Sequence, residues 1–236
     1  MAASRSAQVP RNRLLQALPP EDLARLTPHL RETTLEQHKK LELPRTPATH
    51  VYFPWSGVCS LTTLLRDGRV VEVGTIGNEG MVGMSIYFGG LLPQALTVVQ
   101  VRGDGAHVMK AGVFAAEMAR QGAFYHLIRR YSQALIALFM QSAACNGVHD
   151  IDQRCARWLL MSQDRAGDKI GLTQEYLASM LGVRRSSVTE VARRLQSDGL
   201  INYRRGQITI LNRAGLERLS CECYAVVRAH FDHLLP

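Results

Sequence analysis

A run of polar and basic side chains between residues 184 and 193 has the composition of a surface that reads DNA. Its guanidinium groups can each present two donors to guanine or to a phosphate, and its hydroxyl and carboxylate groups can reach other base edges. The side chains concerned are Arg184, Arg185, Ser186, Ser187, Thr189, Glu190 and Arg193. Such side chains can act together only if one rigid element points them in the same direction.

The surrounding sequence predicts that element to be the second helix of a helix-turn-helix. Thr173 is suited to N-cap a first helix and to approach DNA, and Gly182 ends that helix where a left-handed residue is needed. Apolar residues then recur at helical spacing and form one buried stripe opposite the polar face. The stripe consists of Val188, Val191, Ala192 and Leu195.

A basic hairpin is predicted directly after the second helix. Asp198-Gly199 stops the helix, two short alternating runs (200–203 and 207–211) read as strands, and a turn containing Arg204 and Arg205 joins them. Residues 172–218 hold eight arginines against four acidic residues. The alternative is a solvated basic surface on an ordinary helical domain. Because helix, turn, helix and basic hairpin follow one another in register, we predict a winged helix-turn-helix that binds duplex DNA.

Composition agrees with a nucleic-acid partner. The 236 residues carry a net charge of +8, a pI near 9.6 and 46% hydrophobic residues. The positive net charge favours binding to a polyanion such as a nucleic acid, although an anionic membrane surface would also attract the chain. No run is long enough to span a bilayer, and residues 1–13 contain no apolar secretion signal. Five scattered cysteines indicate a reducing compartment, so we expect a cytoplasmic protein.

The N-terminal half is predicted to be rich in strands. Residues 1–12 are expected to form a flexible arm, and Pro19-Pro20 separates two short leucine-rich helices. Alternating runs begin at Val51, and Asp67-Gly68 is typical of a hairpin turn. At least five short strands indicate an antiparallel sandwich or barrel. The first domain is expected to cover residues 13–120.

A long helix should connect the halves and occupy residues 121–149. Seven residues follow one another in steps of three and four, as in a coiled coil. They are Phe124, Ile128, Tyr131, Leu135, Leu138, Ser142 and Cys145. The two interpretations are a core helix packed on its own sheet and a seam against a second copy. Reading a symmetric DNA site requires a dimer, so we favour the seam. Residues 150–236 are expected to form the winged helix-turn-helix domain.

The order of these parts resembles the Crp/Fnr superfamily of bacterial transcription regulators. The resemblance rests on QRCARWLL (153–160), on LTQEYLASMLGVRRSSVTEVARRLQSDGLI (172–201) and on RRGQITI (204–210). VYFPWSG (51–57), the hairpin RDGR and GNEGMVGM (77–84) match more loosely. It implies an α+β fold with an N-terminal antiparallel β-roll, a long dimerisation helix and the C-terminal winged helix-turn-helix. It also implies double-stranded DNA, a homodimer, RNA polymerase and a small-molecule effector as partners.

The sequence departs from the family's patterns at its functional positions. Ser186 stands where a base-reading glutamate is frequent, and Glu190 where many members have arginine, so an unusual operator is expected. In the position of the cyclic-nucleotide cassette lie Glu79, Gly80, Met81 and Gln94. Met81 cannot accept a hydrogen bond from ribose and Gln94 brings no charge to a phosphate. We therefore expect a degenerate effector pocket that does not bind cAMP.

Other chemistries receive less support. Cys221-x-Cys223 with His230 and His233 could suggest zinc, but two residues separated by one position on a helix point about 200° apart. His107, His126 and His149 could bind haem but belong to no motif. We find no catalytic constellation and expect no enzyme, metal or cofactor. The rival hypothesis is a haem, metal or thiol sensor whose output is DNA binding.

Overall fold

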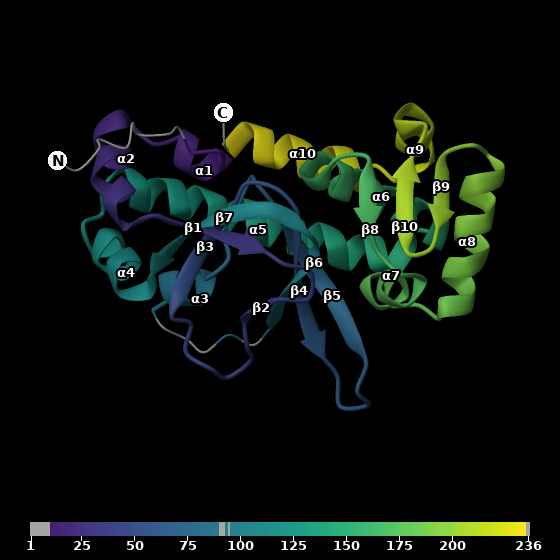
Figure 1. Cartoon of the computed structure of the whole chain (residues 1–236), viewed down its shortest axis with the longest axis horizontal. Helices are drawn as coiled ribbons and strands as arrows, with labels where there is room; N and C mark the ends of the chain where they lie inside the picture. Colours follow the sequence, from purple (N-terminus) through teal and green to yellow (C-terminus); the bar gives the residue numbers. More distant parts are fainter. Residues whose placement is uncertain (1–9, 90–92, 94, 235–236) are drawn as a thin grey trace.

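Seven strands between Arg31 and Lys110 form two antiparallel sheets (Figure 1). The computed structural model describes residues 10–89, 93 and 95–234. One sheet has the strand order β1-β7-β3 and the other β2-β6-β4-β5. Their strands are β1 (Arg31–Leu35), β2 (Lys40–Glu42), β3 (His50–Pro54), β4 (Val58–Leu64), β5 (Val70–Ile76), β6 (Leu96–Val101) and β7 (Gly103–Lys110). The predicted hairpin at Asp67-Gly68 is confirmed, with Gly68 at φ 85°.

Short helices surround this β-roll. They are α1 (Arg13–Gln16), α2 (Pro20–Leu26), the 3₁₀ turn η1 (Thr27–His29), α3 (Met84–Tyr87) and α4 (Ala111–Ala119). Residues 1–9 of the expected arm lie outside the described residues. Residues 10–12 correct that expectation, because Asn12 is fully buried and N-caps α1. Its amide also donates to the carbonyls of Pro54, at 2.7 Å, and Gly80, at 2.9 Å.

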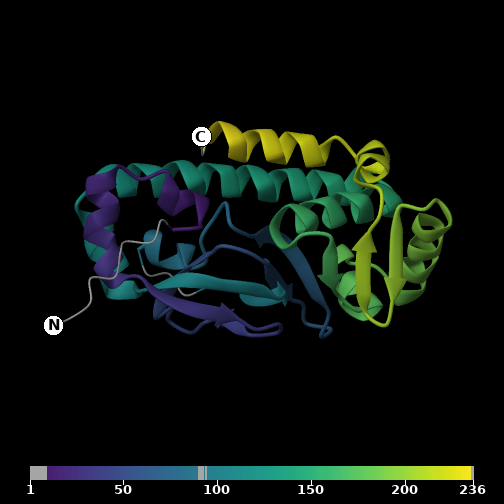
Figure 2. The same cartoon turned by 45° about the horizontal axis from the view of Figure 1, so that its top comes forward.

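The long helix α5 (Ala123–Val148) runs along one side of the β-roll (Figure 2). Its apolar face packs into the core of that domain with Phe53, Phe114 and Met81. Six of the seven residues expected at a dimer seam are buried within this single chain. They are Phe124, Ile128, Tyr131, Leu135, Leu138 and Cys145, while Ser142 is half-buried. The periodicity therefore marks the face that the chain covers with its own sheet and C-terminal helix.

A second core lies in the C-terminal part. It is built by α6 (Ile151–Ala166), β8 (Lys169–Gly171), α7 (Gln174–Leu181), α8 (Arg185–Ser197), β9 (Ile201–Arg204), β10 (Gln207–Ile210) and α9 (Arg213–Leu219). Asp150 begins α6 through a reciprocal capping box with Gln153. The strands form an antiparallel sheet of order β8-β10-β9, in which β8 was not anticipated.

The last helix returns across the molecule. Helix α10 (Cys223–Leu234) leaves the second core and lies along α5 (Figure 2). Val227 and Phe231 belong to the first core, and the rings of Phe231 and Tyr131 lie 6.4 Å apart between centroids. A boundary at residue 150 thus separates the two parts along the sequence but not in their packing. None of the helices over residues 10–89, 93 and 95–234 combines the length and hydrophobicity needed to cross a membrane.

Candidate nucleic-acid interface

Helices α7 and α8 are held in a helix-turn-helix by local turn chemistry. The Thr173 side chain accepts a hydrogen bond from the backbone N–H of Tyr176, which caps α7. Gly182 ends α7 at φ 66° and ψ 33°, a left-handed conformation that favours glycine. The buried stripe of α8 consists of Val188, Val191, Ala192 and Leu195, as predicted.

The opposite face of α8 points its polar side chains outward. Arg184, Arg185, Ser186, Glu190 and Arg193 are exposed, whereas Ser187 and Thr189 are half-buried. The Thr189 hydroxyl donates to the side-chain oxygen of Gln174, at 2.9 Å, and so ties α8 to α7. Thr189 therefore serves the packing of the two helices, while the fully exposed residues form a surface that a DNA groove can reach.

The wing is a two-residue hairpin between β9 and β10. Arg204 pairs with Gln207, and the two connecting residues, Arg205 and Gly206, have φ values of 50° and 75°. Positive φ at both positions is the geometry of a type I′ turn, which fits the twist of two antiparallel strands. Arg204 and Arg205 are both exposed at this tip. Their guanidinium groups are available to phosphate oxygens.

Residues that the sequence analysis did not identify fix the orientation of this surface. Asp152 of α6 accepts a bidentate ion pair from Arg194, with Nη2 and Oδ2 at 2.7 Å. The side-chain oxygen of Gln196 accepts from the backbone N–H of Tyr203 at 2.8 Å and joins α8 to the wing. No local sequence signal distinguishes Asp152 and Gln196 from other polar residues, because the groups that they bind belong to other elements.

Comparisons with known proteins address both the fold and this domain. A protein assigned as a Crp/Fnr family regulator from Eubacterium rectale superposes with a TM-score of 0.66 at 20% identity, covering 87% of this chain and 96% of its own. FixK2 from Bradyrhizobium japonicum gives a TM-score of 0.68 at 16% identity, with 81% and 98% covered. Residues 153–219 match the family model of a Crp-like helix-turn-helix domain. The chain thus shares the fold of these two proteins, and residues 153–219 form a Crp-like helix-turn-helix domain. A search of curated protein sequences finds no match.

One face of the long helix α5 remains uncovered. Its exposed residues again follow one another in steps of four and three, but on the side away from the β-roll. They are Arg129, Gln133, Ile136, Met140, Ala143 and Gly147, which we call the outer seam. Ile136 is 50% exposed and Met140 69% exposed. The exposed face of α5 is thus the outer seam rather than the residues selected from the sequence.

The β-roll has a cavity of about 370 Å³ that is open to the surface and lies beside α5. Its lining is apolar and includes Met81, Met84 and Phe139. Glu42 is the one ionisable side chain among the described lining residues, and it accepts hydrogen bonds from Ser85 and Thr97. Burial raises the pKa of Glu42 above its usual range, although the two hydroxyl groups oppose this shift. The cavity suits an uncharged apolar molecule and disfavours a phosphate.

Two of the four residues expected in the effector pocket lie elsewhere. Glu79 is buried and forms an ion pair with Arg165 of α6. Gly80 packs against the ring of Tyr131, where an added Cβ would lie 2.5 Å from the hydroxyl oxygen. Met81 lines the cavity as expected, whereas Gln94 lies outside the described residues. The expectation for Glu79 and Gly80 is corrected because both face the helices that cover the β-roll.

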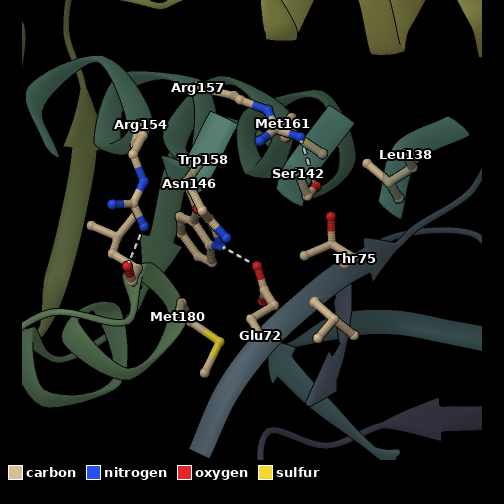
Figure 3. A pocket seen from close by; sticks show the side chains of 13 residues that line it. Glu72, Thr75, Leu138, Ser142, Asn146, Arg154, Arg157, Trp158, Met161 and Met180 are labelled. Carbon is tan, nitrogen blue, oxygen red and sulfur yellow. Dashed lines mark hydrogen bonds between the residues drawn. The ribbon is translucent and has the colours of Figure 1, made fainter. Parts of the chain in front are cut away.

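A smaller cavity of about 40 Å³ separates β5 from α5, α6 and α7 (Figure 3). It has room for only a few water molecules. Glu72 of β5 accepts a hydrogen bond from the indole N–H of Trp158, at 3.0 Å (Figure 3). It accepts another from the hydroxyl of Ser60. Burial raises the pKa of Glu72 to about 7, against the opposing effect of these hydrogen bonds. This carboxyl group links the β-roll to the helix-turn-helix domain.

Proposed function

We propose that the chain is a homodimeric transcription regulator that binds specific DNA sequences through α8. The observation that carries this proposal is the two-faced nature of α8. Its apolar stripe is buried, whereas Arg185 and its exposed polar neighbours face outward without a covering element. A helix with that arrangement inserts its N-terminal residues in the major groove. The arginines of the wing then hold the flanking phosphates.

The outer seam supports the dimeric form of this proposal. Two copies related by a two-fold axis would pair identical helices, and small residues at Ala143 and Gly147 would allow close approach. The apolar contacts at Ile136 and Met140 would supply most of the buried area. Each protomer would then present one recognition helix to one half-site of a pseudo-palindrome.

The cavity in the β-roll supports a small, uncharged effector. Its described lining contains neither histidine nor cysteine, so it lacks the proximal haem ligands that globins and P450 enzymes use. A signal from the cavity could reach the recognition helix through the hairpin of β4 and β5. The tip of that hairpin borders a groove shared with Arg184 and Arg185. The protein would act in the cytoplasm, where it could contact RNA polymerase at promoters.

Selection of bound genomic fragments tests the proposal directly. Purified protein should enrich a small set of fragments, and footprinting should show two protected half-sites about 34–36 Å apart, one helical turn of DNA. Binding that is equally strong on scrambled duplexes would contradict sequence-specific regulation. Protection of a single half-site by a monomer would contradict only the dimeric arrangement.

A further inference from the structure

A second constellation of reactive side chains lies far from the recognition helix, where α5 ends and α10 begins. Its members are Cys145, His149, Cys221 and Cys223, which we call the cysteine–histidine cluster. From the sequence, zinc binding received little support because Cys221 and Cys223 were expected to share one helix. The structure corrects this premise, because α10 starts at Cys223 and Cys221 lies before it. The two thiols converge, and their partners are Cys145 and His149 rather than His230 and His233.

Two of the distances in the cluster are close to those between the ligands of one tetrahedral ion. One ligand atom from each residue lies within 4.8 Å of all the others. The Cys145 and Cys221 sulfurs are 3.5 Å apart, and the Cys223 sulfur is 3.6 Å from Nδ1 of His149. Zinc–sulfur bonds of about 2.3 Å and zinc–nitrogen bonds of about 2.0–2.1 Å at tetrahedral angles require about 3.8 Å and 3.6 Å respectively. A disulfide would require about 2.05 Å between sulfurs.

The groups around the cluster orient its ligands. The Nε2 atom of His149 lies 3.2 Å from the carboxylate of Glu222, so this nitrogen carries the proton and Nδ1 directs its lone pair toward the sulfurs. The amide of Gln141 donates to the Cys223 sulfur at 3.0 Å.

We propose that the cysteine–histidine cluster binds a single zinc ion per chain. Three thiolates and one imidazole form a tetrahedral donor set that favours zinc over the harder divalent ions. The three sulfurs are buried, and all four coordination positions are occupied by the protein, as in structural rather than catalytic sites. Binding releases the thiol protons to solvent and leaves His149 neutral.

A zinc ion at this position would connect the end of α5 to the start of α10. Cys145 and His149 lie in the last turn and at the C-cap of α5, directly before Asp150 begins α6. Cys221 and Cys223 lie in and after the connection between α9 and α10. Zinc would therefore clamp the hinge between the long helix and the DNA-binding domain to the start of the returning helix.

Metal analysis of the full chain, expressed without a histidine tag and kept reduced, tests the proposal. We expect one zinc ion per chain by mass spectrometry. After removal of zinc with a chelator, cobalt chloride should produce the thiolate charge-transfer and d–d absorption of a tetrahedral site. Returning zinc chloride to about 100 times its dissociation constant should raise the Tm by roughly 5–10 °C. A folded, reduced chain that fails to bind either ion would overturn the proposal.

Matched variants locate the ion within the chain. Cys145→Ser and Cys223→Ser should abolish stoichiometric binding, whereas Cys155→Ala, which alters a buried cysteine of the second core, should retain it.

Glu222→Gln should weaken zinc affinity by about 10–100-fold, because it removes the partner of His149, while Glu217→Gln should leave it unchanged. The assignment would be overturned if the double substitution His230→Asn with His233→Asn abolished zinc binding. It would also be overturned if the Cys145→Ser and Cys223→Ser variants still bound zinc. The cobalt spectrum of the unaltered chain decides the matter if a serine variant does not fold.

Discussion

Arg165 and Glu79 form an ion pair that is buried between the two halves of the molecule. Nη2 of Arg165 lies 2.7 Å from Oε1 of Glu79, and the side chains are only 6% and 8% exposed. Arg165 also donates to the hydroxyl of Thr75, and Glu79 accepts from the backbone N–H of Gly77. The pair is therefore fully engaged, and it joins α6 of the helix-turn-helix domain to the turn after β5.

Removing one member of this pair should destabilise the chain strongly. Arg165→Met leaves the Glu79 carboxylate buried without its partner, which costs about 3–5 kcal/mol of unfolding free energy. Urea denaturation measures the loss. Replacing both residues, as Arg165→Met with Glu79→Leu, should restore much of it, because neither charge is then buried. Arg228→Met, which removes an exposed pair with Asp232, should cost no more than about 1 kcal/mol. Equal effects of Arg165→Met and Arg228→Met would contradict the role of burial.

The carboxyl group of Glu72 should make stability depend on pH. Its pKa is raised from 4.5 to about 7 in the folded chain, mainly by burial. The folded chain thus keeps a proton that the unfolded chain releases within this interval, so stability falls as the pH rises from 4.5 to 7. The decrease should reach at most about 3 kcal/mol, since the side chain is only partly shielded from solvent. Urea titrations at pH 5 and pH 8 measure it. Glu72→Gln should reduce the difference, and an unchanged pH dependence would argue against this group.

Substitutions in α8 and in the wing should separate base reading from phosphate binding. Arg185→Ala should cost about 1–3 kcal/mol on the selected operator and little on scrambled DNA, because a bidentate base contact is lost. Arg205→Ala should weaken both duplexes similarly and reduce the slope of log K against log salt by about one unit per contact. Titrations at several salt concentrations measure both effects. The reverse pattern would show that helix and wing exchange roles.

The outer seam of α5 should control the oligomeric state. Ile136→Glu with Met140→Glu places like charges in the centre of the proposed interface, so sedimentation should detect monomers at micromolar concentration. Leu43→Glu alters another exposed apolar residue outside α5 and should leave the dimer intact. The far-ultraviolet circular dichroism of both variants should match the unaltered chain. A dimer that survives the double substitution would place the interface on another surface.

Cyclic AMP should not stabilise the chain. Among the lining residues that the structure describes, the β-roll cavity has one ionisable side chain, the acidic Glu42, and no cation that could hold a phosphate. A ligand present at 100 times its dissociation constant would add about 2.7 kcal/mol to the state it binds. Millimolar cAMP should therefore leave both the Tm and the DNA affinity unchanged. A rise in Tm of several degrees would show that the cavity binds the nucleotide after all.

The helix-turn-helix could be predicted from the sequence because its determinants are local. The cap at Thr173, the left-handed Gly182 and the Arg205-Gly206 turn each act on residues within a few positions. The apolar stripe of α8 packs into the core of its own domain. Local chemistry and periodicity were therefore sufficient for the domain and for its exposed arginines.

The features that the sequence did not predict depend on distant partners. The periodicity of α5 correctly indicates a buried face, but it does not specify whether a sheet, a returning helix or a second copy covers that face. The cysteine–histidine cluster was missed because Cys221 and Cys223 were expected on one helix, whereas α9 ends at Leu219 and α10 begins at Cys223. Its two halves are also 72 positions apart in the sequence, from His149 to Cys221. A pattern of short-range spacing cannot join such segments.

The return of α10 to the first core has a consequence for how the chain is made. Phe231, which packs beside Tyr131, is synthesised 100 residues later. At about 5–20 residues per second, the ribosome exposes the apolar face of α5 for roughly 5–20 s before the helix that covers it exists. During that interval the nascent chain offers a binding surface to chaperones, and a ribosome that stalls within the DNA-binding domain leaves an aggregation-prone β-roll behind.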